Sequence, residues 1–391
     1  MNVVLFTDTY PPFINGVSTS CYNLSQTLKA HGHNVLVVTP RSSGGKLEYK
    51  DGIIYMPGIQ ARNFYGFRLT KIYDRQVIKW IKEFKPDVIH NQTDVSVGMF
   101  ARKTAKKFKY PIVYTYHTNY EDYTYIVTHG VLDRAAKKVV RLYTNGVAEN
   151  ATEFITPSEK TKNFMRLAGN DLYINCIPTG IDFSIFSKDK FDLNKAEAFR
   201  KEHNIDPDTK VILLLGRLAK EKSVDVSLKD YARFLALYPE IKTKMIVVGE
   251  GPSKKEYELL VHELHISQYV DFIGSVPANE VPFYYHLADV YTSASVTETQ
   301  GLTFMEAMSA GTIVLARYDD NLSGTIVDGQ TGFLFTDVNS FTDKLYHILN
   351  MSEVETQAIT NKAFEIVDIY SIDRFYTNII GVYNRAIKKC W

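Results

Sequence analysis

The sequence lacks the features that mark secreted, zinc-bound and membrane-spanning proteins. It has three cysteines, Cys21, Cys176 and Cys390, without paired spacing. This argues against a disulfide framework or a zinc site and suits a reducing cytoplasm. No apolar run approaches the roughly 18 residues of a membrane span, and Met1–Asp8 has no basic start typical of a signal peptide. We therefore expect a cytoplasmic protein whose first residues form a β-strand.

Motifs of several other enzyme classes are also missing. Asn15-Gly16-Val17 stands where a G-x-G-x-x-G dinucleotide fingerprint would lie, and Ser293-Ala294-Ser295 is no G-x-S-x-G hydrolase elbow. Asp206-Pro207-Asp208 does spell D-x-D, a metal–diphosphate motif in some transferases. It precedes a predicted strand, however, so we interpret it as a turn.

The net charge of +1 conceals an asymmetry between the two halves of the chain. Residues 1–178 carry 23 Lys and Arg against 14 Asp and Glu, a net charge of +9, whereas the remainder carries 22 against 30, a net charge of −8. A basic first half predicts an anionic partner, which could be nucleic acid, an anionic membrane surface or a polyanionic substrate.

Apolar strand-like runs alternate with helical stretches along the whole chain, which predicts parallel, doubly wound α/β sheets. Strands are expected at 3–7, 34–39, 86–90, 112–116, 153–158 and 174–178, and again at 210–216, 245–249, 270–274, 290–293 and 312–316. A length of 391 residues favours two domains. We predict two Rossmann-like domains that face a central cleft, at 1–178 and 179–370, with a hinge near 180. Residues 328–335 should form a hairpin-like turn, and an amphipathic helix at 371–391 should pack back onto the first domain.

The most informative stretch of the chain is Thr297–Glu306. Glu298 and Glu306 flank a glycine loop between a predicted strand and a predicted helix. Unpaired N–H groups at a helix start suit a phosphate, and a glutamate on each side can bind hydroxyls. The arrangement fits a nucleotide sugar, with sugar hydroxyls at one end, a diphosphate in the middle and ribose at the other end.

Three further loops that follow predicted strands carry candidate site residues, each with a plainer alternative. Arg217 and Lys222 would neutralise a diphosphate without a metal, or they belong to a solvated basic loop. Gly16 lets the backbone approach a ligand closely at a helix start, or it serves an ordinary tight turn. His117 is well placed for a cleft, or it is a structural histidine.

A basic stripe at helical spacing is a candidate membrane surface. Its residues recur at i, i+3, i+4 and i+7 among apolar neighbours, so the segment could lie on an anionic bilayer or be a solvated face. The stripe consists of Arg134, Lys137, Lys138 and Arg141. Phe64 and Tyr65 lie in a loop that mixes aromatics with arginine, as interfacial loops do, although a packed loop would look the same.

Together these motifs resemble a known family. The ordered set Gly16, His117, Arg217 with Lys222, and Glu298 with Glu306 is similar to retaining glycosyltransferases of GT-B fold marked by Glu-x7-Glu, over nearly the whole chain. Residues 115–123 and 297–303 look like those of bacterial diacylglycerol glucosyltransferases, which make monoglucosyldiacylglycerol at the cytoplasmic membrane face. The family loop is often Gly-Gly-Val. Asn15 replaces the first glycine here.

The resemblance implies catalytic roles for four residues. Arg217 and Lys222 would hold the diphosphate and stabilise its charge as it leaves. Glu298 would hydrogen-bond the ring hydroxyls of the sugar, and His117 would contact its primary hydroxyl. The acceptor would attack on the front face, so that the anomeric configuration is retained and the leaving phosphate helps to deprotonate the acceptor.

The resemblance also implies a donor-binding set. Its members meet the phosphates, the sugar, the ribose and the border of the base: Gly16, Val276, Thr299, Gln300, Gly301, Leu302 and Glu306. No cofactor is expected to bind tightly, because UDP-glucose serves as a co-substrate. A divalent metal is not required by such a site, although it could stimulate the reaction.

The combined prediction is a retaining hexosyltransferase that moves glucose from UDP-glucose to a membrane lipid, 1,2-diacylglycerol. Its partners would be the nucleotide-sugar donor, the lipid acceptor and an anionic membrane surface on the inner face of the cell membrane, with no nucleic acid. Two alternatives stay open. One is a nucleotide-sugar transferase with a soluble or cell-wall polymer acceptor, and the other is a non-catalytic protein that binds polyanions or membranes.

Overall fold

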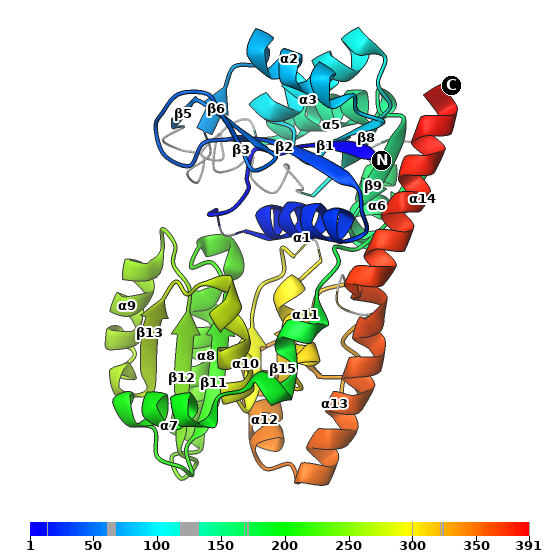
Figure 1. The fold of residues 1–391 in the computed structure, drawn as a ribbon. Coiled ribbons are helices and arrows are strands. Elements are labelled where there is room, and N and C mark those ends of the chain that lie inside the picture. Colours follow the sequence, from blue (N-terminus) through cyan, green and yellow to red (C-terminus); the bar gives the residue numbers. More distant parts are fainter. Residues whose placement is uncertain are drawn as a thin grey trace. The chain divides into compact units, whose positions relative to one another are not determined.

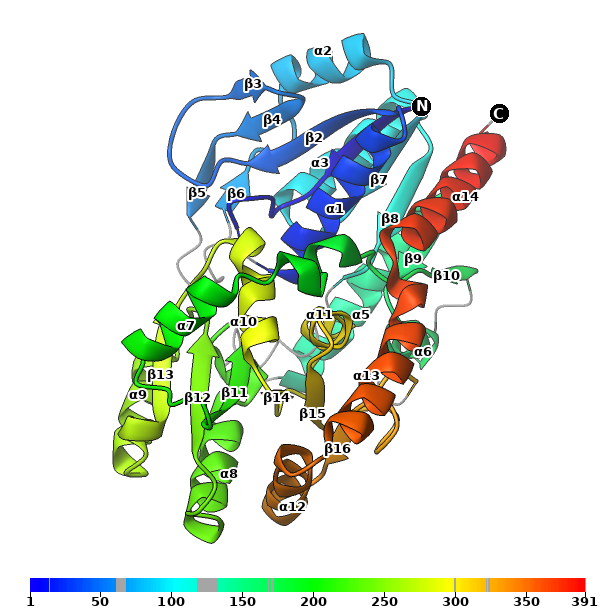
Figure 2. The same ribbon diagram turned by 60° about the horizontal axis from the view of Figure 1, so that its bottom comes forward.

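The structure is a computed structural model of the 391-residue chain. It describes all residues except Ile14, Ala168, Thr299, Asn321, Ser323, Trp391 and the segments 61–67, 118–132 and 170–171, and it describes only the backbone of residues 133–137. The chain divides into two compact units (Figures 1 and 2). Unit 1 comprises Met1–Ile181 with Ile372–Trp391, and unit 2 comprises Asp182–Ser371.

Unit 1 is built on an eight-stranded sheet with the order β10-β9-β8-β7-β1-β2-β4-β3. All neighbouring strands are parallel except β3 and β4. The strands are β1 (Asn2–Phe6), β2 (Asn34–Pro40), β3 (Glu48–Lys50), β4 (Ile53–Met56), β7 (Val88–Asn91), β8 (Ile112–Thr115), β9 (Glu153–Thr156) and β10 (Ile174–Cys176). The chain passes from β1 to β2 on one side and returns to β7 on the other. The carboxyl ends of β1 and β7 therefore form a topological switch point, where α/β sheets bind ligands.

Helices cover both faces of the unit 1 sheet because its strands are apolar on both sides. Val3 and Leu5 pack against α1 (Gly16–Ala30) and α14 (Ile372–Cys390). Val4 and Phe6 pack against α2 (Arg75–Phe84) and α3 (Ser96–Phe108), and Figure 1 shows α1 and α3 on opposite sides of the sheet. Two helices near β9 and β10, α5 (Asp133–Glu149) and α6 (Glu159–Leu167), cover the far end of the sheet.

Unit 2 is built on a six-stranded, fully parallel sheet with the order β13-β12-β11-β14-β15-β16. The strands are β11 (Lys210–Leu215), β12 (Thr243–Val248), β13 (Val270–Gly274), β14 (Val290–Ser293), β15 (Ile313–Arg317) and β16 (Phe333–Phe335). The helices are α7 (Leu193–Glu202), α8 (Val224–Leu237), α9 (Lys254–Glu263), α10 (Val281–Leu287), α11 (Leu302–Ser309), α12 (Val338–Leu349) and α13 (Glu353–Val367). The strand order reverses between β11 and β14, which sets the switch point of this unit.

Two doubly wound parallel sheets confirm the prediction of two Rossmann-like α/β domains. The turn predicted at 328–335 is present over residues 328–332, where the Gly329 N–H donates to the carbonyl of Gly332 at 2.9 Å. The residues that follow it form β16, which pairs parallel to β15 with Leu315 opposite Phe333, and Phe333 and Phe335 are buried there. The short strands β3, β4, β5 (Gly58–Gln60) and β6 (Arg68–Thr70) escaped prediction because their sequences carry little alternation. No helix in the described parts of the chain has both the length and the apolar character to cross a membrane.

Candidate active site

The switch point of unit 2 brings predicted site residues together. Lys222 lies in the loop after β11, and Glu298 lies in the loop after β14. Because β11 and β14 are parallel neighbours, the two loops leave the sheet at the same edge. Nζ of Lys222 lies 2.5 Å from Oε1 of Glu298, and both side chains are partly exposed.

The loop that carries Arg217 is held by close backbone contact with the loop after β12. A Cβ on Gly249 would lie 1.8 Å from the carbonyl oxygen of Gly216, and one on Gly251 would lie 2.1 Å from that of Leu218. The Leu218 N–H also donates to the carbonyl of Glu250 at 3.0 Å. Only glycines permit this approach, so the backbone beneath Arg217 is fixed.

Helix α11 starts in the glycine loop between the two glutamates. Its N-cap is Gly301, at φ +75°, and no side chain caps the first turn. A Cβ on Gly301 would lie 2.7 Å from the Phe304 ring. Uncapped N–H groups at a helix start favour an anion.

Glu306 lies on the second turn of α11 and is half-buried. The Tyr285 hydroxyl donates a hydrogen bond to its Oε2 at 2.9 Å. Burial raises the pKa of Glu306, and the bond from Tyr285 opposes that rise. This contact fixes the orientation of the carboxylate, which can accept hydrogen bonds from hydroxyl groups.

The remaining donor-site predictions in unit 2 lie at the same edge of the sheet. Gln300 is buried, Leu302 is the first residue of α11, and Val276 follows the end of β13 by two residues. Thr299 lies outside the described residues. Two cations and an open helix start suit phosphates, and two carboxylates suit hydroxyls. The edge can therefore hold a phosphorylated polyol such as a nucleotide sugar.

Unit 1 carries the other two predicted site residues. Gly16 is the first residue of α1 and follows Asn15, whose Oδ1 accepts the Ser18 N–H at 2.8 Å. The asparagine that departs from the family pattern therefore caps this helix. His117 follows the end of β8, and its Nε2 lies 2.6 Å from Oε1 of Gln92. Burial lowers the pKa of His117 to about 4.

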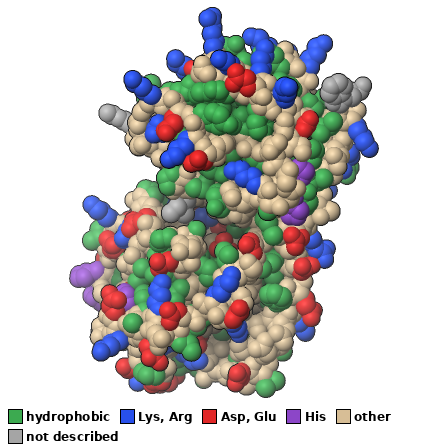
Figure 3. Space-filling model, viewed as in Figure 1, with side chains coloured by type: hydrophobic (Ala, Val, Ile, Leu, Met, Phe, Trp, Pro, Cys, Tyr) green, Lys and Arg blue, Asp and Glu red, His purple; other side chains and the backbone are tan. Residues whose placement is uncertain are grey.

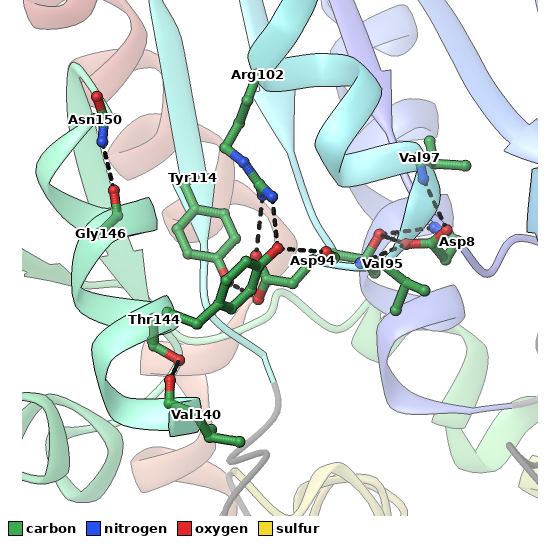
Figure 4. Close-up of polar contacts among 12 residues, drawn as sticks. Asp8, Asp94, Val95, Val97, Arg102, Tyr114, Val140, Thr144, Gly146 and Asn150 are labelled. Carbon is green, nitrogen blue, oxygen red and sulfur yellow. Dashed lines mark hydrogen bonds and ion pairs between the residues drawn. The ribbon is translucent and has the colours of Figure 1, made fainter. Parts of the chain in front are cut away.

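Polar residues that directly follow β1 and β7 also lie at the unit 1 switch point, although they were not among the predicted site residues. Asp8, Gln92 and Asp94 are buried at the unit 1 switch point, and Figure 4 shows Asp8 and Asp94 with their partners. The signal that singled out His117, a polar residue just past a strand end, also applies to Gln92. The sequence does not show that β7 and β8 are neighbours, which is what brings Gln92 to His117.

The predicted membrane surface is described only in part. On α5, Lys138 and Arg141 are exposed beside Val139 and Leu142, which are 65% and 66% exposed. The side chains of Arg134 and Lys137, and the whole of Phe64 and Tyr65, lie outside the described residues. Figure 3 also shows Lys and Arg side chains over α2 and α3. The exposed Lys and Arg residues of these two helices are Arg75, Lys79, Lys82, Lys103, Lys106 and Lys107.

Comparison with known families agrees with this architecture. The family described as "Glycosyl transferases group 1" matches residues 195–363, and "Glycosyltransferase Family 4" matches residues 14–184. Among solved structures, Anabaena HepE in complex with UDP and glucose superposes with a TM-score of 0.76 at 14% identity, over 98% of this chain and 99% of that one. Sucrose-phosphate synthase from Thermosynechococcus elongatus gives 0.75 at 18% identity, over 99% of each chain. The protein is thus a glycosyltransferase with the GT-B fold.

Curated relatives make the family membership firm. The alpha-monoglucosyldiacylglycerol synthase of Acholeplasma laidlawii is 34% identical over the full length of both chains. The synthase of the same name from Streptococcus pneumoniae is 30% identical over 94% of this chain and 82% of its own. The chain therefore belongs to the same glycosyltransferase family as these two enzymes.

Proposed function

We propose that the protein is a retaining glucosyltransferase that uses UDP-glucose and 1,2-diacylglycerol to make alpha-monoglucosyldiacylglycerol. The observation that carries this proposal is the full-length similarity to the A. laidlawii enzyme, whose name states that product. The cations and carboxylates at the unit 2 switch point support it, because they match the parts of a nucleotide sugar.

Each group at that edge has a role in the proposed reaction. Arg217 and Lys222 bind the diphosphate, Glu298 binds sugar hydroxyls, and Glu306 binds the ribose. The first N–H groups of α11, after Gly301, meet the distal phosphate. The set places positive charge where the leaving group becomes more negative, which lowers the barrier.

The chemical step needs no group beyond the donor and the acceptor. The bond between C1 of glucose and the β-phosphate oxygen breaks, and its electron pair stays on UDP. The acceptor oxygen bonds to C1 on the same face, and its proton passes to the leaving phosphate oxygen. Configuration at C1 is retained, and no divalent cation enters the balance.

Unit 1 is proposed to meet the lipid and the membrane. Lys138 and Arg141 place positive charge beside the exposed apolar side chains of Val139 and Leu142, the combination with which an interfacial helix binds an anionic bilayer. The proposed location is therefore the inner face of the cell membrane, reached by peripheral binding.

The acceptor is tested with radiolabelled UDP-glucose and vesicles that contain diacylglycerol. Labelled glycolipid with retained configuration is expected. If vesicles give no glycolipid while a soluble or polymeric acceptor becomes labelled, the lipid assignment is wrong. Thermal denaturation with UDP-, GDP- and ADP-sugars identifies the donor, because a ligand of the folded state raises the melting temperature.

The membrane surface is tested by vesicle sedimentation. Leu142→Glu should weaken binding to anionic vesicles, because it puts a negative charge on the apolar part of α5. Leu259→Glu is the matched control, since Leu259 is also 66% exposed but lies on α9 of unit 2. Equal binding of the two variants would contradict the assignment to α5, and binding that does not weaken with salt would contradict the electrostatic part.

A further inference from the structure

Gln92 contacts His117 across two neighbouring strands of unit 1. It directly follows β7, its side chain is buried at 2% exposure, and its backbone N–H donates to the carbonyl of Phe6 at 2.9 Å. Its Oε1 lies 2.6 Å from Nε2 of His117, which follows β8. In this orientation of the Gln92 amide, Oε1 accepts a hydrogen bond and Nε2 of His117 donates it, so the proton of the ring is on Nε2.

Asp8 fixes the chain on the far side of Gln92. Its Oδ2 accepts hydrogen bonds from the Thr93 hydroxyl at 2.7 Å and from the Val95 N–H at 3.2 Å, and its Oδ1 accepts the Val97 N–H at 3.1 Å. These N–H groups belong to the start of α3, whose own N-cap provides no side-chain acceptor. Figure 4 shows Asp8 facing Val95 and Val97. Asp8 thus caps α3 and holds the turn after Gln92.

Asp94 holds the same turn from another direction. Its carboxylate accepts a hydrogen bond from the Tyr114 hydroxyl on β8 and pairs with Arg102 on α3 at 3.4 Å. The Tyr143 hydroxyl on α5 donates to its backbone carbonyl at 2.9 Å. Figure 4 shows Tyr114 and Arg102 converging on Asp94. A rigid turn leaves Gln92 little freedom to rotate away from His117.

The imidazole of His117 therefore has one defined tautomer. Burial keeps it neutral by lowering its pKa to about 4, so one ring nitrogen carries a proton and the other does not. The neighbouring His90 of β7 is bonded to Tyr383 and Thr115 at 2.7 Å each, and burial together with the charge of His117 lowers the pKa of His90 to about 3. Nδ1 of His117 has no hydrogen-bond partner among the residues that the structure describes.

We propose that Gln92 is a positioning residue that holds His117 in the Nε2–H tautomer, so that Nδ1 accepts a hydrogen bond from a hydroxyl of the substrate. The proposal rests on the proposed function and on the contact between His117 and the primary hydroxyl of the sugar that the family resemblance implies. It assigns His117 the role of a neutral acceptor, which orients the hydroxyl with its hydrogen toward the ring. It also explains why a buried amide, and not a carboxylate, stands at position 92. A carboxylate there would stabilise the doubly protonated ring and turn Nδ1 into a donor.

Gln92→Glu tests this role through the pH profile. The new carboxylate raises the pKa of His117 toward neutral pH. We expect kcat/KM to fall about tenfold at one pH unit below the new pKa, where about nine tenths of the rings are protonated, and to recover as pH rises above that pKa. The wild-type profile should show no such recovery. A loss that is equal at every pH would mean a merely structural role and would overturn the proposal.

Gln92→Met is the matched variant, because it keeps the volume but has no acceptor and no charge. It should lose activity without a new ionisation between about pH 6 and 9. If Gln92→Met is as active as the wild type at all pH values, Gln92 does not position His117. Circular dichroism and thermal denaturation confirm that both variants are folded.

The tautomer itself is measured without activity, by nitrogen-15 NMR of histidine-labelled full-length protein, with His117→Ala used to assign the signals. Wild-type protein should show a protonated Nε2 and an unprotonated Nδ1 at pH 7. A protonated Nδ1 overturns the proposal whatever the enzyme does. If the protein shows the expected tautomer but does not transfer glucose, the proposed function is wrong. The substrate hydroxyl that we assign to Nδ1 is then wrong as well, but the hydrogen bond between Gln92 and His117 is still supported.

Discussion

Lys222 and Glu298, 76 residues apart in sequence, form an ion pair across the unit 2 switch point, with Nζ and Oε1 separated by 2.5 Å. Each side chain is the other's counter-charge. A bound nucleotide sugar competes for both, because its diphosphate attracts the ammonium group and its hydroxyls donate to the carboxylate. Binding of the sugar and binding of the diphosphate are therefore coupled, because both act on the same ion pair.

Removing the charge of Glu298 should therefore damage donor use. Glu298→Gln keeps the shape of the side chain but leaves Lys222 without its carboxylate, and it weakens the hydrogen bonds accepted from sugar hydroxyls. We expect kcat/KM for UDP-glucose to fall about ten- to hundredfold. Initial rates of label transfer measure the effect.

Asp208→Asn is the control for this experiment. Asp208 is also paired with a lysine, at 2.9 Å from Lys242, but it precedes β11 and so lies at the opposite edge of the sheet. An exposed pair contributes little, so the rate should stay within about twofold of wild type. If Asp208→Asn were the more damaging variant, the D-x-D segment would be functional and our interpretation of it as a turn would fail.

Gly301→Ala should disturb the start of α11. At φ +75° an L-residue is strained by about 1–2 kcal/mol, and the new Cβ would also lie 2.7 Å from the Phe304 ring. The first N–H groups of the helix must then shift, so we expect lower stability together with a raised KM for UDP-glucose. Urea unfolding and initial rates separate the two effects.

Gly329→Ala is the control for Gly301→Ala, because it introduces the same backbone strain without a steric clash. Gly329 has φ +71°, but a Cβ there meets nothing within 4 Å. It should lose about the same 1–2 kcal/mol from strain and keep its KM. An unchanged KM in Gly301→Ala would show that the start of α11 does not bind the donor.

Asp230 on α8 makes unit 2 less stable at neutral pH. The side chain is 6% exposed, and burial raises its pKa from 3.8 to about 6, against the effect of the nearby Arg317 charge. Between these pH values the folded protein binds more protons than the unfolded chain, so stability falls as pH rises. Asp230→Asn should increase the free energy of unfolding by about 1–3 kcal/mol at pH 7.5. Urea unfolding at several pH values should show the gain vanish below about pH 4.

Asp225→Asn is the comparison for Asp230, because it removes an exposed carboxylate from the first turn of the same helix. Its effect should be small and should not follow the same pH curve. A gain for Asp230→Asn that persists at pH 3.5 would contradict ionisation as the cause.

Glu153 links β9 to the C-terminal helix. Its side chain is 2% exposed and lies 2.8 Å from Nζ of Lys389 and 3.6 Å from Nε of Arg385 on α14. Burial alone would raise the pKa of Glu153, but Lys389, Asn175 and Arg385 together lower it. A lowered pKa stabilises the fold above about pH 4.5, and this stability is lost as pH falls.

Lys389→Met should consequently destabilise unit 1 by about 1–3 kcal/mol at pH 7, and by less at pH 4. Lys388→Met is the control, because Lys388 is an exposed neighbour in the last turn of α14. Denaturant unfolding at both pH values measures the difference. Equal losses for the two lysines would show that contact with Glu153 is not what stabilises the helix.

The sequence was enough to predict that the site residues lie just after the ends of strands. It was not enough to predict which of these residues contact one another. Arg217, Lys222 and Glu298 follow apolar strands, so their place at the carboxyl edge was predictable. Whether their loops meet depends on the order β11-β14, which is decided by packing of the whole sheet. The Gln92–His117 contact depends in the same way on β7 and β8 being neighbours.

Long-range capping is equally hidden from local patterns. The start of α3 has no acceptor at Val95, so a local search finds no cap. The acceptor is Asp8, which follows another strand and reaches Ser96 across 88 residues of sequence. Similarly, the sequence of Phe333–Phe335 is compatible with an antiparallel strand of a hairpin and with a parallel edge strand. The structure has the parallel strand, which pairs with β15.

Helix α14 reverses the order in which the chain can fold during synthesis. Phe375, Ile379 and Tyr383 share a core with β1 and α1, so the part of this face of the unit 1 sheet that α1 does not cover stays exposed until residues 372–390 leave the ribosome. Unit 2 is continuous from Asp182 to Ser371 and can close its core earlier. The half of the protein that is made first is thus finished last, and a nascent chain stalled before residue 372 exposes an apolar surface to which a chaperone can bind.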